Sequence, residues 1–243
     1  MANCITKYIP NTLTCCNLFS GAIATVQALN GNYTFALLFI ISGAVFDFFD
    51  GMAARALDSH SPIGADLDSL ADDITFGIAP ASMLFAVLRD MNYPDYLKQI
   101  GVYFPYMAFI LAVFSALRLA KFNIDARQTS SFIGLPVPAN ALFWGSLIAS
   151  ESSFFETAPS FYVIVLTILA LIFSSLLVAE IPMFSLKFKD LKWVNNKIRF
   201  IFLIICIPLI IILKELSLAA IVIWYIILSV LTGKETKKVT TRH

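Results

Sequence analysis

The sequence predicts an all-α protein that crosses a lipid bilayer about eight times. Of its 243 residues 59% are hydrophobic and 14% are charged, whereas soluble domains average about 45–50% and about 25%. The mean hydropathy is +0.82, and the apolar residues gather in segments close to the roughly 20 residues that a membrane-spanning helix needs. These values exclude an ordinary soluble enzyme. A net charge of +1 gives no reason to expect nucleic acid as a partner.

Eight apolar segments, separated by polar residues, proline or glycine, predict the membrane spans. They cover residues 14–30, 33–56, 65–88, 100–121, 136–150, 160–183, 198–213 and 217–232. The fifth segment is short, and only Lys214 and Glu215 stand between the last two apolar runs. Six or seven crossings therefore stay open as alternatives to eight.

The basic residues predict which side of the membrane each loop faces, because cytoplasmic loops carry the excess of Lys and Arg. With the N-terminus inside, 14 of the 17 basic residues fall in inside segments, and only Arg89, Lys98 and Lys214 fall outside. We therefore expect both termini on the cytoplasmic side.

Seven of the 16 acidic residues lie between residues 47 and 73, at the predicted cytoplasmic ends of the second and third spans. Asp47 and Asp50 are three residues apart, so they project from one side of their helix. Asp68 and Asp72 are four apart and do the same on the next helix. The short turn at 57–63 makes the two helices antiparallel neighbours. Four carboxylates therefore converge, and acidic groups within a membrane are costly enough to indicate function.

Converging carboxylates repel one another unless cations lie among them. Carboxylate oxygens suit Mg²⁺, Mn²⁺ or Ca²⁺, so the pattern predicts a paired-metal site. Gly51, Ala54 and Gly64 continue the same helix faces, and side chains this small permit the close approach of a ligand or a helix backbone. The cysteines and histidines lack metal-ligand spacing, so no zinc site is expected.

The acidic segment resembles the signature of the CDP-alcohol phosphotransferase family at every fixed position, Asp47-x2-Asp50-Gly51-x2-Ala54-Arg55-x8-Gly64-x3-Asp68-x3-Asp72. Within that family the chain is most similar to the type II phosphatidylserine synthases. The further matches are Pro10-Asn11-x-Leu13-Thr14, Phe76-Gly77-Ile78-Ala79-Pro80-Ala81, Leu117-Arg118-Leu119-Ala120-Lys121-Phe122-Asn123 and Gly134-Leu135-Pro136-x-Pro138-Ala139. The similarity extends over roughly residues 8–140. Lys121 is a departure, because Arg is commoner there and Lys lacks its planar fork.

The resemblance implies a fold of six core helices, followed in this chain by a C-terminal hairpin. It implies one catalytic domain over residues 1–243, with a core of about 8–185 and a two-helix extension of about 198–232. It also implies that L-serine attacks CDP-diacylglycerol, releasing CMP and leaving phosphatidylserine in the bilayer. Two Mg²⁺ or Mn²⁺ ions, a homodimer and the inner (cytoplasmic) membrane of a bacterium, with the active site on the cytoplasmic side, are implied as well.

The family's roles transfer to individual positions of this chain. Asp47, Asp50 and Asp68 would be metal ligands, and Asp72 would be the general base for the serine hydroxyl and would also reach the second metal. The resemblance assigns the CDP moiety to Gly51, Ala54, Arg55 and Gly64.

The serine site is expected at the cytoplasmic end of the fourth span, because a zwitterionic amino acid needs a cation for its carboxylate. Arg118, Lys121 and Asn123 lie there and are candidates to contact serine or the lipid phosphates. In the first span Asn11, Thr14 and Asn17 are expected either to make hydrogen bonds within the protein or to contact the substrate.

Other functions remain as alternatives. Another member of the family would use glycerol 3-phosphate, inositol or choline as the acceptor. A cation-coupled transporter would need polar groups along a path across the bilayer, whereas these acids gather at one face. A purely structural membrane protein gives no reason to gather four carboxylates.

Overall fold

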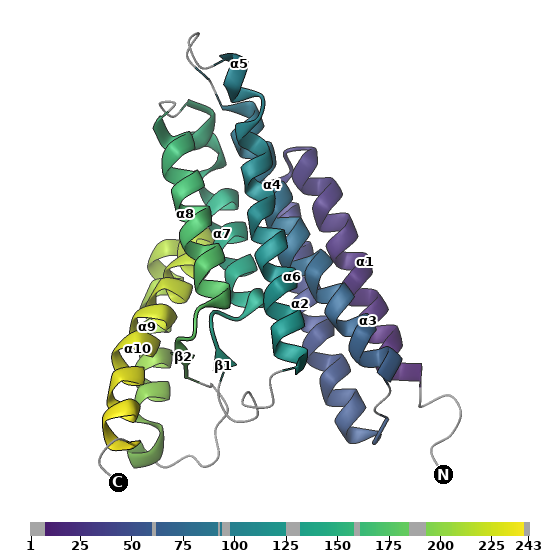
Figure 1. Ribbon diagram of the computed structural model, residues 1–243, viewed down its shortest axis with the longest axis vertical. Helices are drawn as coiled ribbons and strands as arrows, with labels where there is room; N and C mark the ends of the chain where they lie inside the picture. Colours follow the sequence, from purple (N-terminus) through teal and green to yellow (C-terminus); the bar gives the residue numbers. More distant parts are fainter. Residues whose placement is uncertain are drawn as a thin grey trace.

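The computed structural model describes residues 8–59, 62–91, 93, 98–124, 132–157, 161–184 and 193–240. These residues form a bundle of helices with one short β-ribbon (Figure 1). The elements in order are α1 (Ile9–Leu29), α2 (Tyr33–Ala56), α3 (Pro62–Asp72), the π-helix η2 (Asp73–Ile78), α4 (Ala79–Asp90), α5 (Lys98–Gly101), the 3-10 helix η4 (Phe104–Phe109), α6 (Ile110–Ile124), β1 (Phe132–Ile133), α7 (Val137–Thr157), α8 (Phe161–Val178), β2 (Pro182–Met183), α9 (Trp193–Leu213), the 3-10 turn η6 (Lys214–Leu216) and α10 (Ser217–Thr240).

Within the described residues, six helical segments are long and apolar enough to cross a membrane. They are Ile9–Leu29, Tyr33–Ala56, Ile63–Asp90, Phe104–Ile124, Phe161–Val178 and Asn196–Thr232. The prediction of an all-α polytopic membrane protein is confirmed, and helices occupy all eight predicted positions. The count is six because α9 and α10 run on as one segment and because α7, which carries several Ser, one Asn and two Glu, is less apolar.

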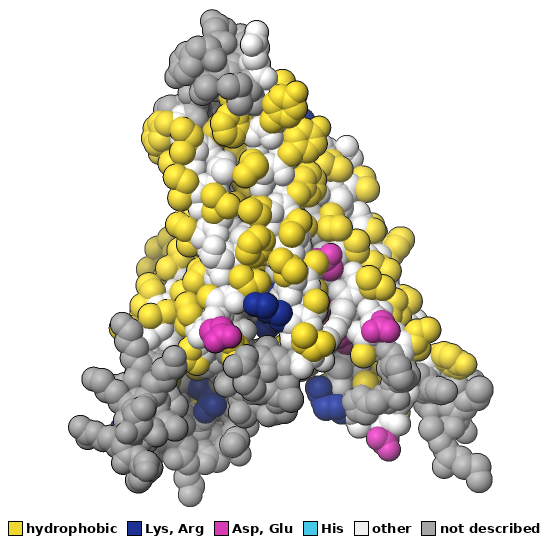
Figure 2. Space-filling view, viewed as in Figure 1, with side chains coloured by type: hydrophobic (Ala, Val, Ile, Leu, Met, Phe, Trp, Pro, Cys, Tyr) yellow, Lys and Arg dark blue, Asp and Glu magenta, His cyan; other side chains and the backbone are white. Residues whose placement is uncertain are grey.

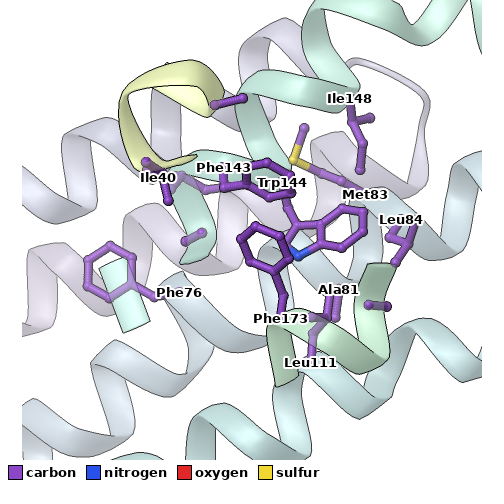
Figure 3. Packing of buried hydrophobic residues seen from close by; sticks show 14 of the residues in the cluster. Ile40, Phe76, Ala81, Met83, Leu84, Leu111, Phe143, Trp144, Ile148 and Phe173 are labelled. Atoms are coloured by element: carbon purple, nitrogen blue, oxygen red, sulfur yellow. The ribbon is translucent and has the colours of Figure 1, made fainter. Parts of the chain in front are cut away.

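The core lies around α4: 67% of an 18-residue apolar stretch within Ile63–Asp90 is buried, at least twice the share in the other spans. Trp144 on α7 and Met83 on α4 are fully buried (Figure 3). The rings of Phe143 on α7 and Phe173 on α8 stack with their centroids 3.9 Å apart. The surrounding helices therefore pack on α4 and α7 and turn their other faces outward.

The outward faces of the helices are apolar, as a bilayer requires. Figure 2 shows hydrophobic side chains over the upper and middle parts of the molecule and most of the charged side chains towards its lower end. Figure 1, in the same view, places the end of α2, the start of α3 and the end of α6 at that lower end. The acidic segment therefore lies at one end of the bundle.

The β-ribbon ties the start of α7 to the end of α8. Phe132 pairs with Met183 and Ile133 with Pro182 in antiparallel register. Gly134 follows with a φ of +79°, and a Cβ at that position would lie about 3.0 Å from the carbonyl oxygen of Ala179. Only glycine fits this turn without strain.

The C-terminal hairpin of α9 and α10 packs on the rest of the bundle mainly through α10 and α7. Its turn is held at Ser146, whose hydroxyl donates to the carbonyl of Glu215 and accepts from the amide of Ala219 at 3.1 Å. Ser146 lies at the middle of α7 (Val137–Thr157). The turn of the hairpin is therefore level with the middle of α7 and not with its end.

Candidate functional site

Three aspartates from two helices meet at one point. Asp47 and Asp50 from α2 and Asp68 from α3 each offer a carboxylate oxygen, and these oxygens all lie within 4.8 Å of one another. Asp50 is buried, and within the described part of the chain the Oδ1 atom of Asp68 is buried without a hydrogen-bond partner. Carboxylates gathered this closely, with a buried oxygen left unpaired, fit a hard divalent cation.

The first helix holds Asp50 in place. The Thr14 hydroxyl on α1 donates to Oδ2 of Asp50 at 2.7 Å, and it also lies 3.0 Å from the carbonyl oxygen of Pro10 one turn earlier. Thr14 and Asp50 are 3% and 6% exposed. Because a buried carboxylate needs hydrogen bonds to fix its orientation, Thr14 orients this candidate ligand from behind.

Asp72, at the end of α3, lies beside the group of three without belonging to it. Its Oδ1 atom accepts a hydrogen bond of 3.1 Å from Nδ2 of Asn17 on α1. It interacts electrostatically with Asp47, Asp68 and Asp50. The structure thus brings all four predicted aspartates into one region and gives Asp72 a separate hydrogen-bond partner.

A π-helix begins directly after Asp72, and such helices are rare and frequent at functional sites. Its Thr75 hydroxyl donates to the carbonyl oxygen of Asn17 at 3.0 Å. A Cβ at Gly21 of α1 would lie 2.7 Å from Cα of Thr75, and one at Gly43 of α2 would lie 2.5 Å from its Cγ2. The two glycines therefore let α1, α2 and the π-helix meet behind the aspartates.

Our sequence analysis did not identify Thr75, Gly21 or Gly43. The signal for the two glycines was present, because an isolated glycine within an apolar span often marks close helix packing. Nothing in the sequence pattern marks Thr75, since the irregular π-turn changes which face of the helix it occupies.

A pocket of about 410 Å³ opens beside the aspartates between α1, α2 and α3. Its lining contains Asp50 and Asp68 and every residue predicted for the CDP moiety, which are Gly51, Ala54, Arg55 and Gly64. Two of the three first-span candidates, Asn11 and Thr14, line it as well, whereas Asn17 does not. The remaining lining residues are Pro10, Ser59 and Ala65. The nearest atom that a Cβ at Gly51 would meet is Nη1 of Arg55, at 3.5 Å. The guanidinium therefore reaches over Gly51 at the mouth of the pocket.

The three candidates for the acceptor site are placed differently from one another. Arg118 is 7% exposed and interacts electrostatically with Asp72. Lys121 is exposed. Asn123 is exposed as well, and its Nδ2 donates to the hydroxyl of Ser69 on α3 at 2.8 Å. Of the three, Arg118 is the one that is buried beside the candidate base.

Comparison with known proteins shows which family the chain belongs to. Residues 7–184 match the sequence model described as CDP-alcohol phosphatidyltransferase. This matched region contains the four aspartates, the pocket and Arg118, and it ends before the C-terminal hairpin.

Individual relatives carry similar names. A protein of Bacillus subtilis named CDP-diacylglycerol–serine O-phosphatidyltransferase is 40% identical over 132 residues, which are 54% of this chain and 70% of the relative. A Helicobacter pylori protein of the same name is 32% identical over 55% of this chain and 54% of its own length. A Methanothermobacter thermautotrophicus protein named archaetidylserine synthase is 29% identical over 68% of each chain.

Proposed function

Because the chain belongs to the CDP-alcohol phosphatidyltransferase family, we propose that it transfers the phosphatidyl group of CDP-diacylglycerol to the hydroxyl of L-serine. The products are phosphatidylserine and CMP. The names of the relatives support serine as the acceptor. The observation that carries the proposal is the meeting of Asp47, Asp50 and Asp68 beside a pocket that opens between membrane-spanning helices.

The proposed reaction is one displacement at phosphorus. The serine oxygen forms a bond to the phosphorus that carries diacylglycerol, the bond from that phosphorus to the bridging oxygen breaks, and CMP leaves with the bridging oxygen. The proton of the serine hydroxyl passes to Asp72. The hydrogen bond from Asn17 orients the Asp72 carboxylate, and the negative charges of the neighbouring aspartates favour its taking up a proton.

The CDP moiety is assigned to the pocket between α1, α2 and α3. Gly51, Ala54 and Gly64 leave room for the nucleotide to lie against the helices. The Arg55 guanidinium at the mouth of the pocket can pair with a phosphate oxygen.

Asp47, Asp50 and Asp68 would hold divalent cations, with Asp72 also reaching the second of two ions, and the donor set suits Mg²⁺ or Mn²⁺. When bound, such ions neutralise the pyrophosphate and the charge that develops on the departing CMP. The aspartates supply the negative charge that makes this position selective for cations.

Arg118 is our candidate for the carboxylate of serine, because it is a buried cation beside the proposed base. We expect Arg118→Ala to raise the KM for serine while the KM for CDP-diacylglycerol stays the same. If the KM values for both substrates equal those of the unaltered protein, Arg118 does not bind the acceptor.

CMP release by the purified protein tests the function directly. The assay contains CDP-diacylglycerol in detergent, Mg²⁺ or Mn²⁺, and serine, glycerol 3-phosphate, inositol or choline in separate reactions. We expect release that needs serine and metal and that is lost in Asp72→Asn. The matched control is Asp66→Asn, which changes an exposed aspartate of the same helix. Release with a different acceptor would keep the family chemistry and refute serine.

We further propose a single catalytic domain, a homodimer, and an active site with both termini on the cytoplasmic side of a bacterial inner membrane. The distribution of Lys and Arg supports the orientation, and the resemblance to the family supports the rest. Reporter fusions at each terminus test the orientation. The mass of the protein in detergent, compared with 26.9 kDa for one chain, tests the dimer.

A further inference from the structure

Two polar side chains without a partner in the protein meet where the π-helix η2 packs on α6. Oδ1 of Asp73 is a buried atom, and so is Oγ of Ser115, whose side chain is 0% exposed. Among the residues that the structure describes, neither atom has a hydrogen-bond partner. Buried polar atoms are costly to leave unpaired, so the two oxygens point to a ligand that forms hydrogen bonds with them.

Gly77 lets these two side chains approach each other. A Cβ at Gly77 would lie 2.6 Å from Oδ1 of Asp73 and 3.1 Å from Cβ of Ser115. The next atom that it would meet is Cα of Ala112 on α6, at 3.5 Å. The Asp73 carboxylate therefore lies on the α6 side of the π-helix, whereas that of Asp72 accepts a hydrogen bond from α1.

The groups around this contact have the charges that an amino acid needs. Asp73 lies outside the group of three aspartates, and its carboxylate and the Ser115 hydroxyl can both accept hydrogen bonds from an ammonium group. Arg118 follows Ser115 by one turn on the same face of α6, and its Nε and Nη2 atoms are buried without a partner in the described residues. No ion pair within this part of the chain joins Arg118 to Asp73, so neither charge neutralises the other directly.

The two charged groups lie on the same side of the Gly77 contact. In Figure 1 the chain rises from α3 through η2 into α4, away from the end of the bundle where α3 begins, and α6 returns towards that end. Asp73 precedes Gly77 by about one turn, and Arg118 follows Ser115 by about one turn. An acceptor bound between Asp73 and Arg118 is therefore close to Asp72, the neighbour of Asp73 and the proposed base.

We propose that Asp73 and the Ser115 hydroxyl bind the ammonium group of the incoming amino acid while Arg118 binds its carboxylate. Asp73 then determines acceptor specificity, because its negative charge attracts a zwitterion and repels glycerol 3-phosphate, which has no positive charge to offset its phosphate. This inference rests on the proposed function, because it concerns which acceptor the same reaction takes.

Asp73→Asn tests this, since it keeps the shape of the side chain and removes its charge. We expect the KM for serine to rise at least about tenfold, as for the loss of a hydrogen bond between charged groups. The KM for CDP-diacylglycerol and kcat should change less than about threefold. The matched control is Asp66→Asn, on the exposed surface of α3, which should leave all three constants unchanged. An unchanged KM for serine in Asp73→Asn overturns the inference.

Ser115→Ala separates ligand binding from a structural role. The hydroxyl has no partner in the described part of the protein, so its removal breaks no internal hydrogen bond, and we expect the melting temperature not to fall. The KM for serine should nevertheless rise about fivefold. A lower melting temperature with an unchanged KM for serine would mean that Ser115 is structural and would overturn its part in the site.

Two serine analogues without a hydroxyl, which cannot react, identify the charge that Asp73 recognises. L-Alanine keeps both charged groups of serine, and propanoate keeps only the carboxylate. In Asp73→Asn we expect the inhibition constant of L-alanine against serine to rise about tenfold and that of propanoate to change less than about twofold. In Arg118→Ala both constants should rise. Equal rises for the two analogues in Asp73→Asn would show that Asp73 does not bind the ammonium group.

The same measurements separate this inference from the function on which it rests. If the unaltered protein releases no CMP with serine, the proposed function fails and this inference fails with it. If the unaltered protein uses serine and Asp73→Asn has the same KM for serine, only the role of Asp73 is refuted.

Discussion

The hydroxyl of Thr14 donates a hydrogen bond of 2.7 Å to the carboxylate of Asp50, and this bond joins the first helix to the cluster of three aspartates. Both side chains are buried, so water competes little for this bond. The first helix thus orients the candidate metal site as well as lining the pocket beside it.

Removing the Thr14 hydroxyl should weaken metal binding. In Thr14→Val, Asp50 loses a partner that orients it, and we expect the Kd for Mn²⁺ to rise about tenfold, as is typical for residues that support metal ligands. Electron paramagnetic resonance of free Mn²⁺ measures this. Thr14→Ser keeps the hydroxyl and should restore the affinity; equal loss in both variants would show that the methyl group and not the bond is what matters.

Removing a candidate ligand should abolish most of the activity. Asp68→Asn takes one negative charge from the cluster, and we expect kcat to fall by at least about 100-fold, because metal ions supply several kcal/mol to the transition state. CMP release at saturating substrate is the measurement. Asp66→Asn, two residues earlier and exposed, is the control. If the two variants have comparable activity, Asp68 is not a ligand of a catalytic metal ion.

Divalent cations should stabilise the protein as well as activate it. The clustered carboxylates repel one another in the absence of cations, and a ligand that binds only the folded state raises its stability. We expect the melting temperature of the chelator-treated protein to rise on addition of Mg²⁺ or Mn²⁺. The rise should be much smaller in Asp47→Asn. A melting temperature that is independent of metal in the unaltered protein would count against a metal site.

The close packing behind the site should make Gly21 intolerant of a side chain. An added Cβ would lie 2.7 Å from Cα of Thr75, which is backbone and cannot move aside. We expect Gly21→Ala to destabilise the protein by about 1–3 kcal/mol, the usual cost of overpacking. In Gly145→Ala the nearest atom is Cδ1 of Leu37, at the end of a flexible side chain, so the loss should be much smaller. Thermal unfolding of the two variants in detergent tests the difference.

Asn123 should matter less for serine than Arg118. Its side chain is exposed and donates to Ser69 on α3, so we assign it to the contact between α6 and α3. We expect Asn123→Ala to change the KM for serine by less than about threefold, in line with one exposed neutral hydrogen bond. Steady-state kinetics with serine as the varied substrate decide this. If the KM for serine rises more in Asn123→Ala than in Arg118→Ala, Asn123 is part of the acceptor site after all.

The sequence by itself determined the fold class and the metal-binding candidates of this protein. Hydrophobic segments of bilayer length leave a chain few structures other than a helical bundle. The three- and four-residue spacings of Asp47 with Asp50 and of Asp68 with Asp72 put each pair on one helix face, because helix geometry fixes which side chains are neighbours. The residues predicted for the CDP moiety all line one pocket for the same reason.

Only the tertiary structure decided which residues support that site from other helices. The π-helix after Asp72 changes the helical period, so no spacing rule predicts that Thr75 meets Asn17. Ser146 on α7 meets Glu215 across 69 residues, and a contact over that distance depends on how whole helices pack. Local spacing is determined by the geometry of one helix, whereas the partners of Asp50 and Asp72, Thr14 and Asn17, are determined by the packing of α1 against α2 and α3.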